Sequence, residues 1–136
     1  MAHPVEVVLQ FEHAINSRNP DAISALMAPD GEFIDSLGAI LKGAERLRAA
    51  WAGYFKMFPD YSISHTEIFA EGNTVAIFGA AQGTLAADGE MKRENFWKTP
   101  AAWRAVVRDG KIAVWQVYAD NEPARAVMRK RAAPVG

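Results

Sequence analysis

The sequence predicts an α+β domain in which N-terminal helices pack on one face of a strongly curved antiparallel sheet. Two observations support this prediction. Helical periodicity dominates the chain as far as Met57, and the alternation typical of strands dominates the remainder. The chain contains no internal repeat and no linker-like segment. We therefore expect residues 1–136 to form one domain.

Two helices are expected first. Residues 5–17 place apolar side chains on a broad face, which is typical of a helix packed against a core. Asn19 is a suitable N-cap for a second helix over 22–27. Pro20 suits the first turn of that helix, because its missing N–H would have no helical partner there.

A turn and a short strand follow. The sequence PDG at 29–31 predicts the turn, and 32–37 predict the strand. In such a strand Asp35 shares one face with Phe33 and Leu37. Carboxylates are rare among buried apolar residues. Asp35 is therefore either a functional carboxylate that faces a pocket or a turn residue that accepts hydrogen bonds from backbone amides.

The clearest helix is expected over 44–57. Its apolar side chains recur at spacings of three and four, so that they form one buried stripe. The stripe consists of Leu47, Ala50, Trp51, Tyr54, Phe55 and Phe58. Pro59 ends this helix, because the residue before a proline is disfavoured in the helical conformation.

The remainder predicts a strand meander and a closing helix. The strands are expected over 61–70, 74–83, 96–108 and 112–119, and the helix over 122–131. One face of the longest strand carries Trp97, Thr99, Ala101, Trp103, Ala105 and Val107. Pro100 lies on the other face, which indicates a bulge or an edge at that point.

The composition narrows the class of protein. The chain has 15 basic and 16 acidic residues, a balance that gives no electrostatic footprint for nucleic acid. It has no cysteine, so neither a disulfide framework nor thiolate chemistry is expected. The N-terminus becomes polar too soon for a secretory signal, and no apolar run approaches a membrane span. We expect a soluble cytoplasmic protein without a nucleic-acid or membrane partner.

Motifs for several kinds of chemistry are missing. The sequence has no glycine-rich phosphate loop, no nucleophile elbow and no HExxH zinc motif. His3, His13 and His65 lack the spacing of metal ligands, so no metal and no cofactor are expected. His65 either faces a cavity or is a hydrogen-bonded structural histidine.

Four segments carry a resemblance to a known family. They read FEHAINSRNPDAISALMAPDGEFIDSLG (11–38), KGAERLRAAWAGYFKMFPDYSI (42–63), AEGNTVAIFGAAQGT (70–84) and RDGKIAVWQVYAD (108–120). With the order of elements, they resemble the cone-shaped NTF2-like fold and especially its SnoaL-like subgroup, which includes polyketide cyclases. The ketosteroid isomerases are a more distant resemblance. This fold hosts both enzymes and binding modules, so the resemblance implies a fold more strongly than an activity.

The resemblance implies two acid/base positions. Ketosteroid isomerases keep a general-base aspartate after the second helix, and Asp35 in FIDSLG matches that place. SnoaL-type cyclases keep an acid/base aspartate near the end of the last strand, and Asp120 in VYAD matches it. A second interpretation of Asp120 is open, in which it starts the following turn and caps the last helix.

The chain departs from the isomerase pattern where the substrate carbonyl would be polarised. Phe11 stands in the place of the isomerase tyrosine, and the place of the protonated acid falls on Ala101 or Ala102. Without a donor where charge develops, enolisation loses its largest stabilisation, so steroid isomerase activity is not expected. The epoxide hydrolases of this fold need an Asp-Arg-Asp set, for which Arg104 is the candidate arginine. The strand alternation places Arg104 on the face away from Trp103, so this function is disfavoured.

An apolar ligand pocket is expected beside the aspartates. Trp97 and Trp103 bracket smaller residues on one strand face, and large residues around small ones leave a hollow typical of ligand sites. We therefore expect a flat, hydrophobic, ring-containing small molecule. The residues expected to line its site are Phe11, Trp51, Tyr54, Phe58, His65, Trp97, Trp103, Gln116 and Tyr118. Trp115 is expected to pack under the helices or in a dimer interface.

Two classes of function remain open. In the first, the protein is an enzyme of the cyclase, isomerase or hydratase type, with Asp35 as base and Asp120 as a second acid/base. In the second, it is a non-catalytic ligand-binding or dimeric assembly module, which the missing donors favour. A homodimer is expected in both cases, because the resemblance implies one and an open sheet face with aromatic residues needs cover.

Overall fold

The computed structural model describes residues 2–87 and 89–132. Within these residues the helices span Pro4–Asn16 (α1), Pro20–Leu26 (α2), Ala44–Met57 (α3) and Glu122–Ala132 (α4). The strands span Met27–Ile34 (β1), Ile40–Lys42 (β2), Ser62–Glu71 (β3), Thr74–Ala87 (β4), Glu90–Arg108 (β5) and Lys111–Ala119 (β6). The predicted order of elements is confirmed, with β2 as an addition that the sequence patterns did not indicate.

The strands form one mixed sheet in the order β2-β1-β6-β5-β4-β3. Strands β3 to β6 form the predicted antiparallel meander. Strand β1 differs because it runs parallel to β6, with Phe33 opposite Trp115. A parallel neighbour requires a long connection, which α3 and the meander supply here. The α+β class is confirmed, and the sheet is mixed rather than wholly antiparallel.

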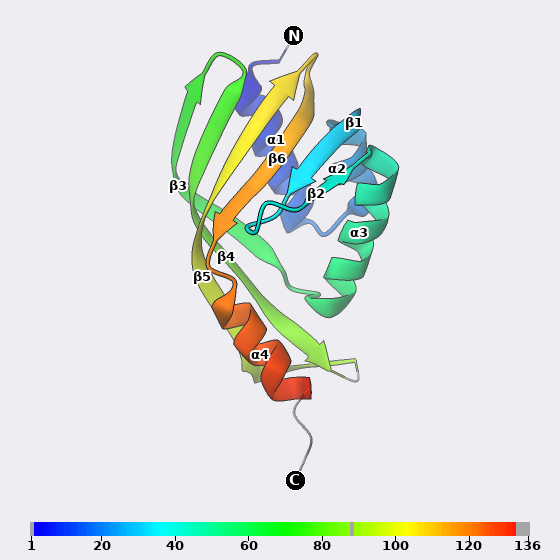
Figure 1. Ribbon diagram of the computed structural model, residues 1–136, viewed down its shortest axis with the longest axis vertical. Coiled ribbons are helices and arrows are strands. Elements are labelled where there is room, and N and C mark those ends of the chain that lie inside the picture. Colours follow the sequence, from blue (N-terminus) through cyan, green and yellow to red (C-terminus); the bar gives the residue numbers. More distant parts are fainter. Residues whose placement is uncertain (1, 88, 133–136) are drawn as a thin grey trace.

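The sheet curves around the N-terminal helices (Figure 1). Helix α1 contacts strands β3 to β6, and α3 closes the side next to β1 and β2. Helix α4 lies at the lower end of the view, against β4 and β5. The largest fully buried side chains between helices and sheet are those of Trp115, Phe11, Phe58, Ile15, Ile23, Leu47 and Ile77. This arrangement leaves the inner face of the sheet shared between a packed core and a cavity.

Local signals account for the helix boundaries. The side-chain oxygen of Asn19 accepts the N–H of Ala22 at 3.1 Å, which confirms the predicted N-cap of α2. Such a cap stabilises a helix by about 1 kcal/mol. Pro20 is the first residue of α2, as expected. Helix α3 ends at Met57, two residues before Pro59, so that its predicted bounds are confirmed.

The first strand differs from the prediction. Residues 29–31 lie inside β1, at a shift in its register with β6, instead of forming a turn. Gly31 suits this crowded place, because an added Cβ would lie 2.9 Å from the carbonyl oxygen of Ala28. The strand ends at Ile34, earlier than expected. Asp35 consequently lies in the turn that leads to β2.

Strand β5 provides an inward face for the site. Every second residue from Asn95 to Val107 is buried, which confirms the predicted face that includes Trp97 and Trp103. Pro100 lies on the outer face, one position beyond the pair of Ala101 with the last residue of β6. The proline therefore stands at a local edge, as predicted.

Candidate functional site

A cavity of about 390 Å³ lies between α3, the β1–β2 segment and the inner face of β5 and β6. Its volume falls within the range of small-molecule sites, about 300–1,000 Å³. Alternate residues of the two central strands form its sheet side, namely Trp97, Thr99 and Trp103 from β5 and Trp115, Val117 and Ala119 from β6. Because the alternation has a period of two, each strand turns one set of side chains to the cavity and the other set to the outside.

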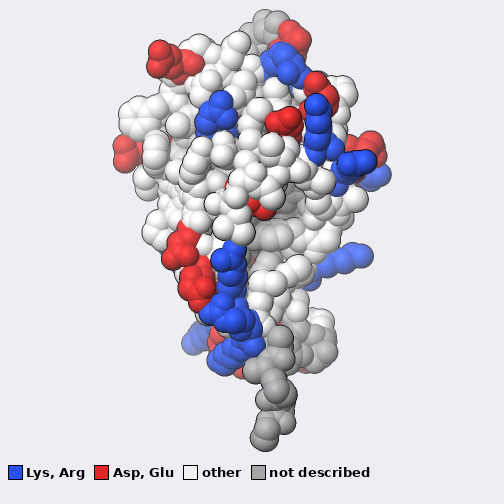
Figure 2. Space-filling model, in the orientation of Figure 1, with Lys and Arg blue, Asp and Glu red and all other residues white. Residues whose placement is uncertain are grey.

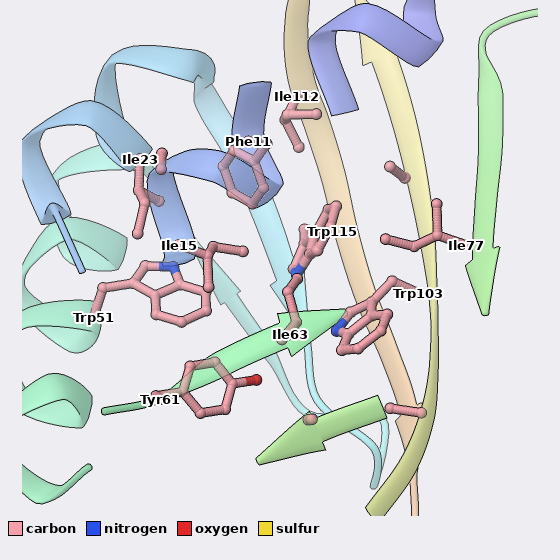
Figure 3. Packing of buried hydrophobic residues seen from close by; sticks show 14 of the residues in the cluster. Phe11, Ile15, Ile23, Trp51, Tyr61, Ile63, Ile77, Trp103, Ile112 and Trp115 are labelled. Atoms are coloured by element: carbon pink, nitrogen blue, oxygen red, sulfur yellow. The ribbon is translucent and has the colours of Figure 1, made fainter. Parts of the chain in front are cut away.

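Aromatic rings build much of the cavity wall. Tyr54 meets Tyr61 edge to face, with ring centroids 4.9 Å apart. Trp103 and Trp115 stack on the sheet side at 6.3 Å. Figure 3 shows Trp51 and Tyr61 on one side of a common space and Trp103 and Trp115 on the other. Walls of this kind suit a flat apolar molecule that stacks between rings.

Asp35 brings a carboxylate to the mouth of the cavity. It lines the cavity from an open turn, in which the neighbouring Leu37 is 76% exposed. Its Oδ1 atom accepts the N–H groups of Leu37 and Ala39, each at 2.9 Å. These bonds fix the orientation of the carboxylate. The two interpretations of Asp35 therefore coexist, since it is a turn residue bonded to backbone amides and also a cavity residue.

A pair of hydrogen-bonded polar side chains also lies at the mouth of the cavity. Asn121 Nδ2 donates to Ser36 Oγ at 2.5 Å, and both residues line the cavity. This bond joins the β1–β2 turn to the segment that leads into α4. Thr99 Oγ1 donates to the carbonyl oxygen of Asp120 at 2.9 Å, which ties β5 to the same segment. The mouth is thus held by side chains from three parts of the chain.

Two tyrosine hydroxyls belong to the wall. Tyr54 and Tyr61 both line the cavity. Burial raises the pKa of Tyr54 to about 12. Burial also raises the pKa of Tyr61 well above its ordinary value, and the nearby Tyr54 adds to that shift. Both groups are therefore neutral at physiological pH and able to donate a hydrogen bond.

Comparisons with known proteins point to the same fold. A family model described as the SnoaL-like domain matches residues 8–115. The chain belongs to the SnoaL-like family. The comparison with curated protein sequences gives no match.

Solved structures related to the SnoaL-like protein share its architecture. A hypothetical protein of ketosteroid isomerase-like fold from Catenulispora acidiphila, in complex with trimethylamine, is 23% identical, with a TM-score of 0.77 over 95% of this chain and 94% of that chain. A candidate polyketide cyclase from Streptomyces antibioticus is 22% identical, with a TM-score of 0.76 over 94% and 99%. A candidate SnoaL-like polyketide cyclase from Shewanella denitrificans is 11% identical, with a TM-score of 0.80 over 93% and 97%. Likeness at these identities shows the fold.

The SnoaL-like cavity brings together part of the predicted site. Its wall includes Asp35, Trp51, Tyr54, Trp97 and Trp103. These residues come from the β1–β2 turn, α3 and β5, which are far apart in the sequence. Their roles toward a ligand stay predictions.

Asp120 lies outside the cavity lining, contrary to the expectation that it shares a site with Asp35. Its Oδ1 atom accepts the N–H of Glu122, the first residue of α4, at 2.9 Å. This is the helix-capping alternative that the sequence left open. The chain turns after Ala119, where β6 ends, and the next residue to face the cavity is Asn121.

Gln116 and Tyr118 also lie outside the cavity, which corrects their predicted place in the site. Trp115 and Val117 face inward, so the side chains between and after them point to the outer face of β6. Tyr118 is accordingly 53% exposed. The prediction assumed that the side of β6 in phase with Asp120 faces the cavity. In the structure the side that carries Trp115 faces the cavity instead.

Phe11 and Phe58 belong to the packed core rather than to the wall, which corrects two further predictions. The ring of Phe11 lies 4.7 Å from that of Trp115, and the ring of Phe58 meets Trp97 edge-on at 5.4 Å. Each phenylalanine thus packs against a tryptophan that lines the cavity and supports it from behind.

His65 is a hydrogen-bonded structural histidine, which is one of its two predicted alternatives, and it does not line the cavity as its place in the expected site implied. Its Nδ1 atom lies 2.7 Å from Glu12 Oε2, so it joins β3 to α1. Across residues 2–87 and 89–132, no group of three or more histidine, cysteine, aspartate or glutamate residues is placed to hold a metal ion.

Tyr61 and Trp115 are among the wall residues that were not predicted from the sequence. Tyr61 was indicated only as the start of a strand, and Trp115 as a packing or interface residue. In the structure both line the cavity. A usable signal was present for Trp115, because it alternates with the apolar Val117 along β6. The place of Tyr61 depends on how the segment between α3 and β3 brings its ring against Tyr54 and Trp97, which no local pattern reveals.

Charged side chains are scattered over the outside of the molecule. Figure 2 shows basic side chains gathered at the lower end over α4, with acidic side chains beside them. Within α4, Arg129 pairs with Glu122, which lowers the pKa of the Glu122 carboxyl.

Arg104 is exposed on the outer face of β5, so it does not approach Asp35 from within the cavity. In the described part of the chain, no helix is long and apolar enough to cross a membrane.

Proposed function

We propose that the protein is a SnoaL-like enzyme of the cyclase, isomerase or hydratase type, which acts on a hydrophobic carbonyl compound. The observation that carries this proposal is the carboxylate of Asp35 at the mouth of a cavity with aromatic walls. An apolar pocket with a few placed polar groups is the usual form of a small-molecule site. The candidate cyclases among the related structures support the same class of chemistry.

In the proposed reaction, Asp35 removes a proton from the carbon next to the ligand carbonyl. The proton moves to the carboxylate, and the electron pair of the C–H bond moves toward the carbonyl oxygen to give an enolate. The turn amides that bond Oδ1 hold the carboxylate in a fixed orientation for this step. No cofactor is required, since the base and the substrate supply every atom and electron.

The substitution Asp35→Asn tests this role. Asparagine retains an oxygen that can accept the two turn amides, but it is not a base. We expect proton removal to slow by about 100-fold to 10,000-fold. A suitable readout is the uptake of deuterium from D₂O at the carbon next to the carbonyl, followed by NMR over a panel of flat aromatic ketones and β-keto esters.

Asp120→Asn is the matched control. Asp120 lies outside the cavity, so this variant should exchange deuterium at the wild-type rate, and its asparagine oxygen can still accept the N–H of Glu122. Exchange that proceeds unchanged in Asp35→Asn would rule out Asp35 as the base.

A second candidate function is a non-catalytic ligand-binding or assembly module. It is favoured by the apolar residues at the isomerase donor positions, since Phe11 is buried in the core and Ala101 is buried on β5. The trimethylamine bound to a related protein supports a small-molecule ligand without implying turnover. Quenching of the cavity tryptophans by aromatic compounds, without deuterium exchange in any of them, would favour this function.

We also propose that the protein is a homodimer. Phe78, Ala102 and Tyr118 are opposite one another on three neighbouring strands, so they share the outer face of the sheet. Phe78 is 45% exposed and also meets the ring of Phe69 at 6.0 Å. An exposed aromatic row of this kind is typical of a surface that another chain covers.

A further inference from the structure

The hydroxyl of Tyr61 is a polar group in the aromatic wall of the cavity. Tyr61 is 7% exposed and lines the cavity. Its hydrogen bonds within residues 2–87 and 89–132 come from its backbone. The N–H donates to the carbonyl oxygen of Phe58 at 3.0 Å, and the C=O accepts from Arg18 Nη1 at 3.3 Å. The backbone of Tyr61 is therefore anchored, while its phenolic oxygen has no protein partner in that part of the chain.

Neighbouring rings hold this hydroxyl in place. The ring of Tyr61 lies 4.9 Å from that of Tyr54 and 6.1 Å from that of Trp97. In Figure 3 the hydroxyl points away from α3, toward Trp103 and Trp115 on the sheet side. A ring packed in this way cannot turn its hydroxyl out to solvent. The oxygen is thus presented to the interior of the cavity.

The indole N–H of Trp97 provides a useful contrast. Within the described residues, its nitrogen is buried away from open space and has no hydrogen-bond partner. The Tyr61 oxygen is not sealed in this way, so an atom of a ligand can reach it. A ligand without an acceptor would displace water and leave the hydroxyl unpaired, at a cost of about 1–3 kcal/mol. A ligand with an acceptor in the same place would avoid that cost.

We propose that the Tyr61 hydroxyl is the hydrogen-bond donor that selects and holds a carbonyl oxygen of a flat, ring-containing ligand. This inference rests on the proposed function of the cavity. Apolar residues occupy both isomerase donor positions, and Tyr61 would supply a donor from a different place in the fold. The raised pKa of Tyr61 is consistent with this role, because the group keeps its proton and acts only as a donor.

The same contact would assist proton removal by Asp35. As the C–H electron pair moves into the carbonyl, negative charge builds on the oxygen that Tyr61 contacts. The tyrosine O–H bond stays intact and its hydrogen bond strengthens as the charge grows. The proton taken from carbon remains on Asp35, so the step is balanced with no further reactant.

The test uses two probes of the same shape, fluorenone and fluorene. Fluorenone has a carbonyl group at the position where fluorene has a methylene group. Binding is followed by tryptophan fluorescence and checked by calorimetry. Wild-type protein is expected to bind fluorenone about tenfold more tightly than fluorene, which is the preference that one net hydrogen bond gives. In Tyr61→Phe this preference should disappear, because fluorenone loses affinity while fluorene does not.

Infrared spectroscopy of bound fluorenone supplies a readout that a packing role would not move. Donation by Tyr61 should lower the carbonyl stretching frequency in the wild type, and Tyr61→Phe should restore the frequency seen in an apolar solvent. Tyr118→Phe removes the same hydroxyl from the exposed outer face and should leave both the preference and the frequency unchanged.

The outcomes separate this inference from the proposed function beneath it. If Tyr61→Phe keeps both the preference and the shifted frequency, Tyr61 is not the donor, although the cavity is still a ligand site. If Tyr54→Phe abolishes them instead, the donor is Tyr54 and the assignment is overturned. If neither probe binds the wild type, the aromatic-ligand function fails and this inference fails with it.

Discussion

Tyr54 is a cavity residue whose ionisation the fold alters strongly. Its ring lies among other aromatic rings, 6.1 Å from Trp51 and 5.0 Å from Phe58, with no charged group as the cause of its shift. Burial raises its pKa to about 12, because the phenolate would lose hydration that the rings cannot replace. The unfolded chain gives up the same proton near pH 10. Folding and proton binding are therefore linked in alkaline solution.

We predict that the free energy of unfolding falls as pH rises from about 10 to about 12. In that window the unfolded state loses a proton that the folded state keeps, and this favours unfolding. Tyr54 alone accounts for about 2–3 kcal/mol of the fall, since one pKa unit corresponds to about 1.4 kcal/mol. Below about pH 10 both states are protonated and the linkage has no effect.

Urea unfolding at a series of pH values, with tyrosinate absorbance at 295 nm as a second probe, measures this effect. In Tyr54→Phe, the free energy of unfolding should fall less above pH 10 than it does in the wild type. Near neutral pH, its dependence on pH should change very little. If the free energy of unfolding of this variant falls as steeply above pH 10 as that of the wild type, the raised pKa assigned to Tyr54 is wrong.

Asp35 shows how far a single residue could be understood from the sequence. The segment FIDSLG shows that Asp35 is a polar residue among apolar neighbours. It also shows that Asp35 matches the position of the general base in the ketosteroid isomerases. That it lies in a turn was not visible, because the strand ends at Ile34 through its pairing with β2 and β6. Asp35 lines the cavity from a turn instead of from the expected strand, and its role as a base stays a prediction.

One amide side chain ties the end of α1 to the start of β3. Asn16 Nδ2 donates to the carbonyl oxygen of Ile63 at 2.9 Å, and Asn16 Oδ1 accepts the N–H of Ile63 at 2.8 Å. Strand β3 is the last strand on its side of the sheet. The amide thus occupies the free edge of β3 in the manner of another strand, next to the segment that carries Tyr61.

We predict that Asn16→Ala destabilises the protein by about 2–4 kcal/mol. The substitution leaves a donor and an acceptor of the buried Ile63 unpaired, each at a cost of about 1–3 kcal/mol. Ser17→Ala is the control, because Ser17 is exposed and its hydroxyl bonds only within the end of α1. We expect it to change stability by no more than about 0.5 kcal/mol. Equal urea midpoints for the two variants would show that the Asn16 contact contributes little.

The elements divide into those that local patterns predict and those that they do not. The bounds of α3 follow from a complete apolar stripe and a following proline, and both signals lie within the helix or next to it. Residues 29–31 resemble a turn in every local respect, yet they continue β1. Their conformation is imposed by the register with β6, whose residues lie about 80 positions later in the chain.

At the level of the molecule, the sheet has two different faces. The inner face is covered by helices and the cavity, while the outer face exposes Phe78 and Tyr118 on a common row. Helices cover one side only (Figure 1), so the outer row has no cover within the described chain. Association of two chains through this face would bury it.

We predict that the protein in solution has twice the 14.9 kDa mass of one chain. Tyr118→Lys should shift it to the monomer, because a charge within the row of Phe78, Ala102 and Tyr118 opposes burial. Leu9→Lys on α1, also at an exposed apolar residue, should leave the mass unchanged. Light scattering after size exclusion measures all three proteins, and a wild-type monomer at every concentration would exclude the dimer.

The sequence by itself determined the helices, the alternating faces of the long strands and the family to which the chain belongs. These features depend on residue types at short spacings, where periodicity and proline signals act directly. The tertiary structure decided that Asp35 lines the cavity while Asp120 caps a helix, and that Tyr61 lines the cavity while Phe11 packs in the core. Those outcomes depend on strand register and on the packing of the Tyr61 ring between Tyr54 of α3 and Trp97 of β5, which bring together residues whose separation in the chain carries no local signal.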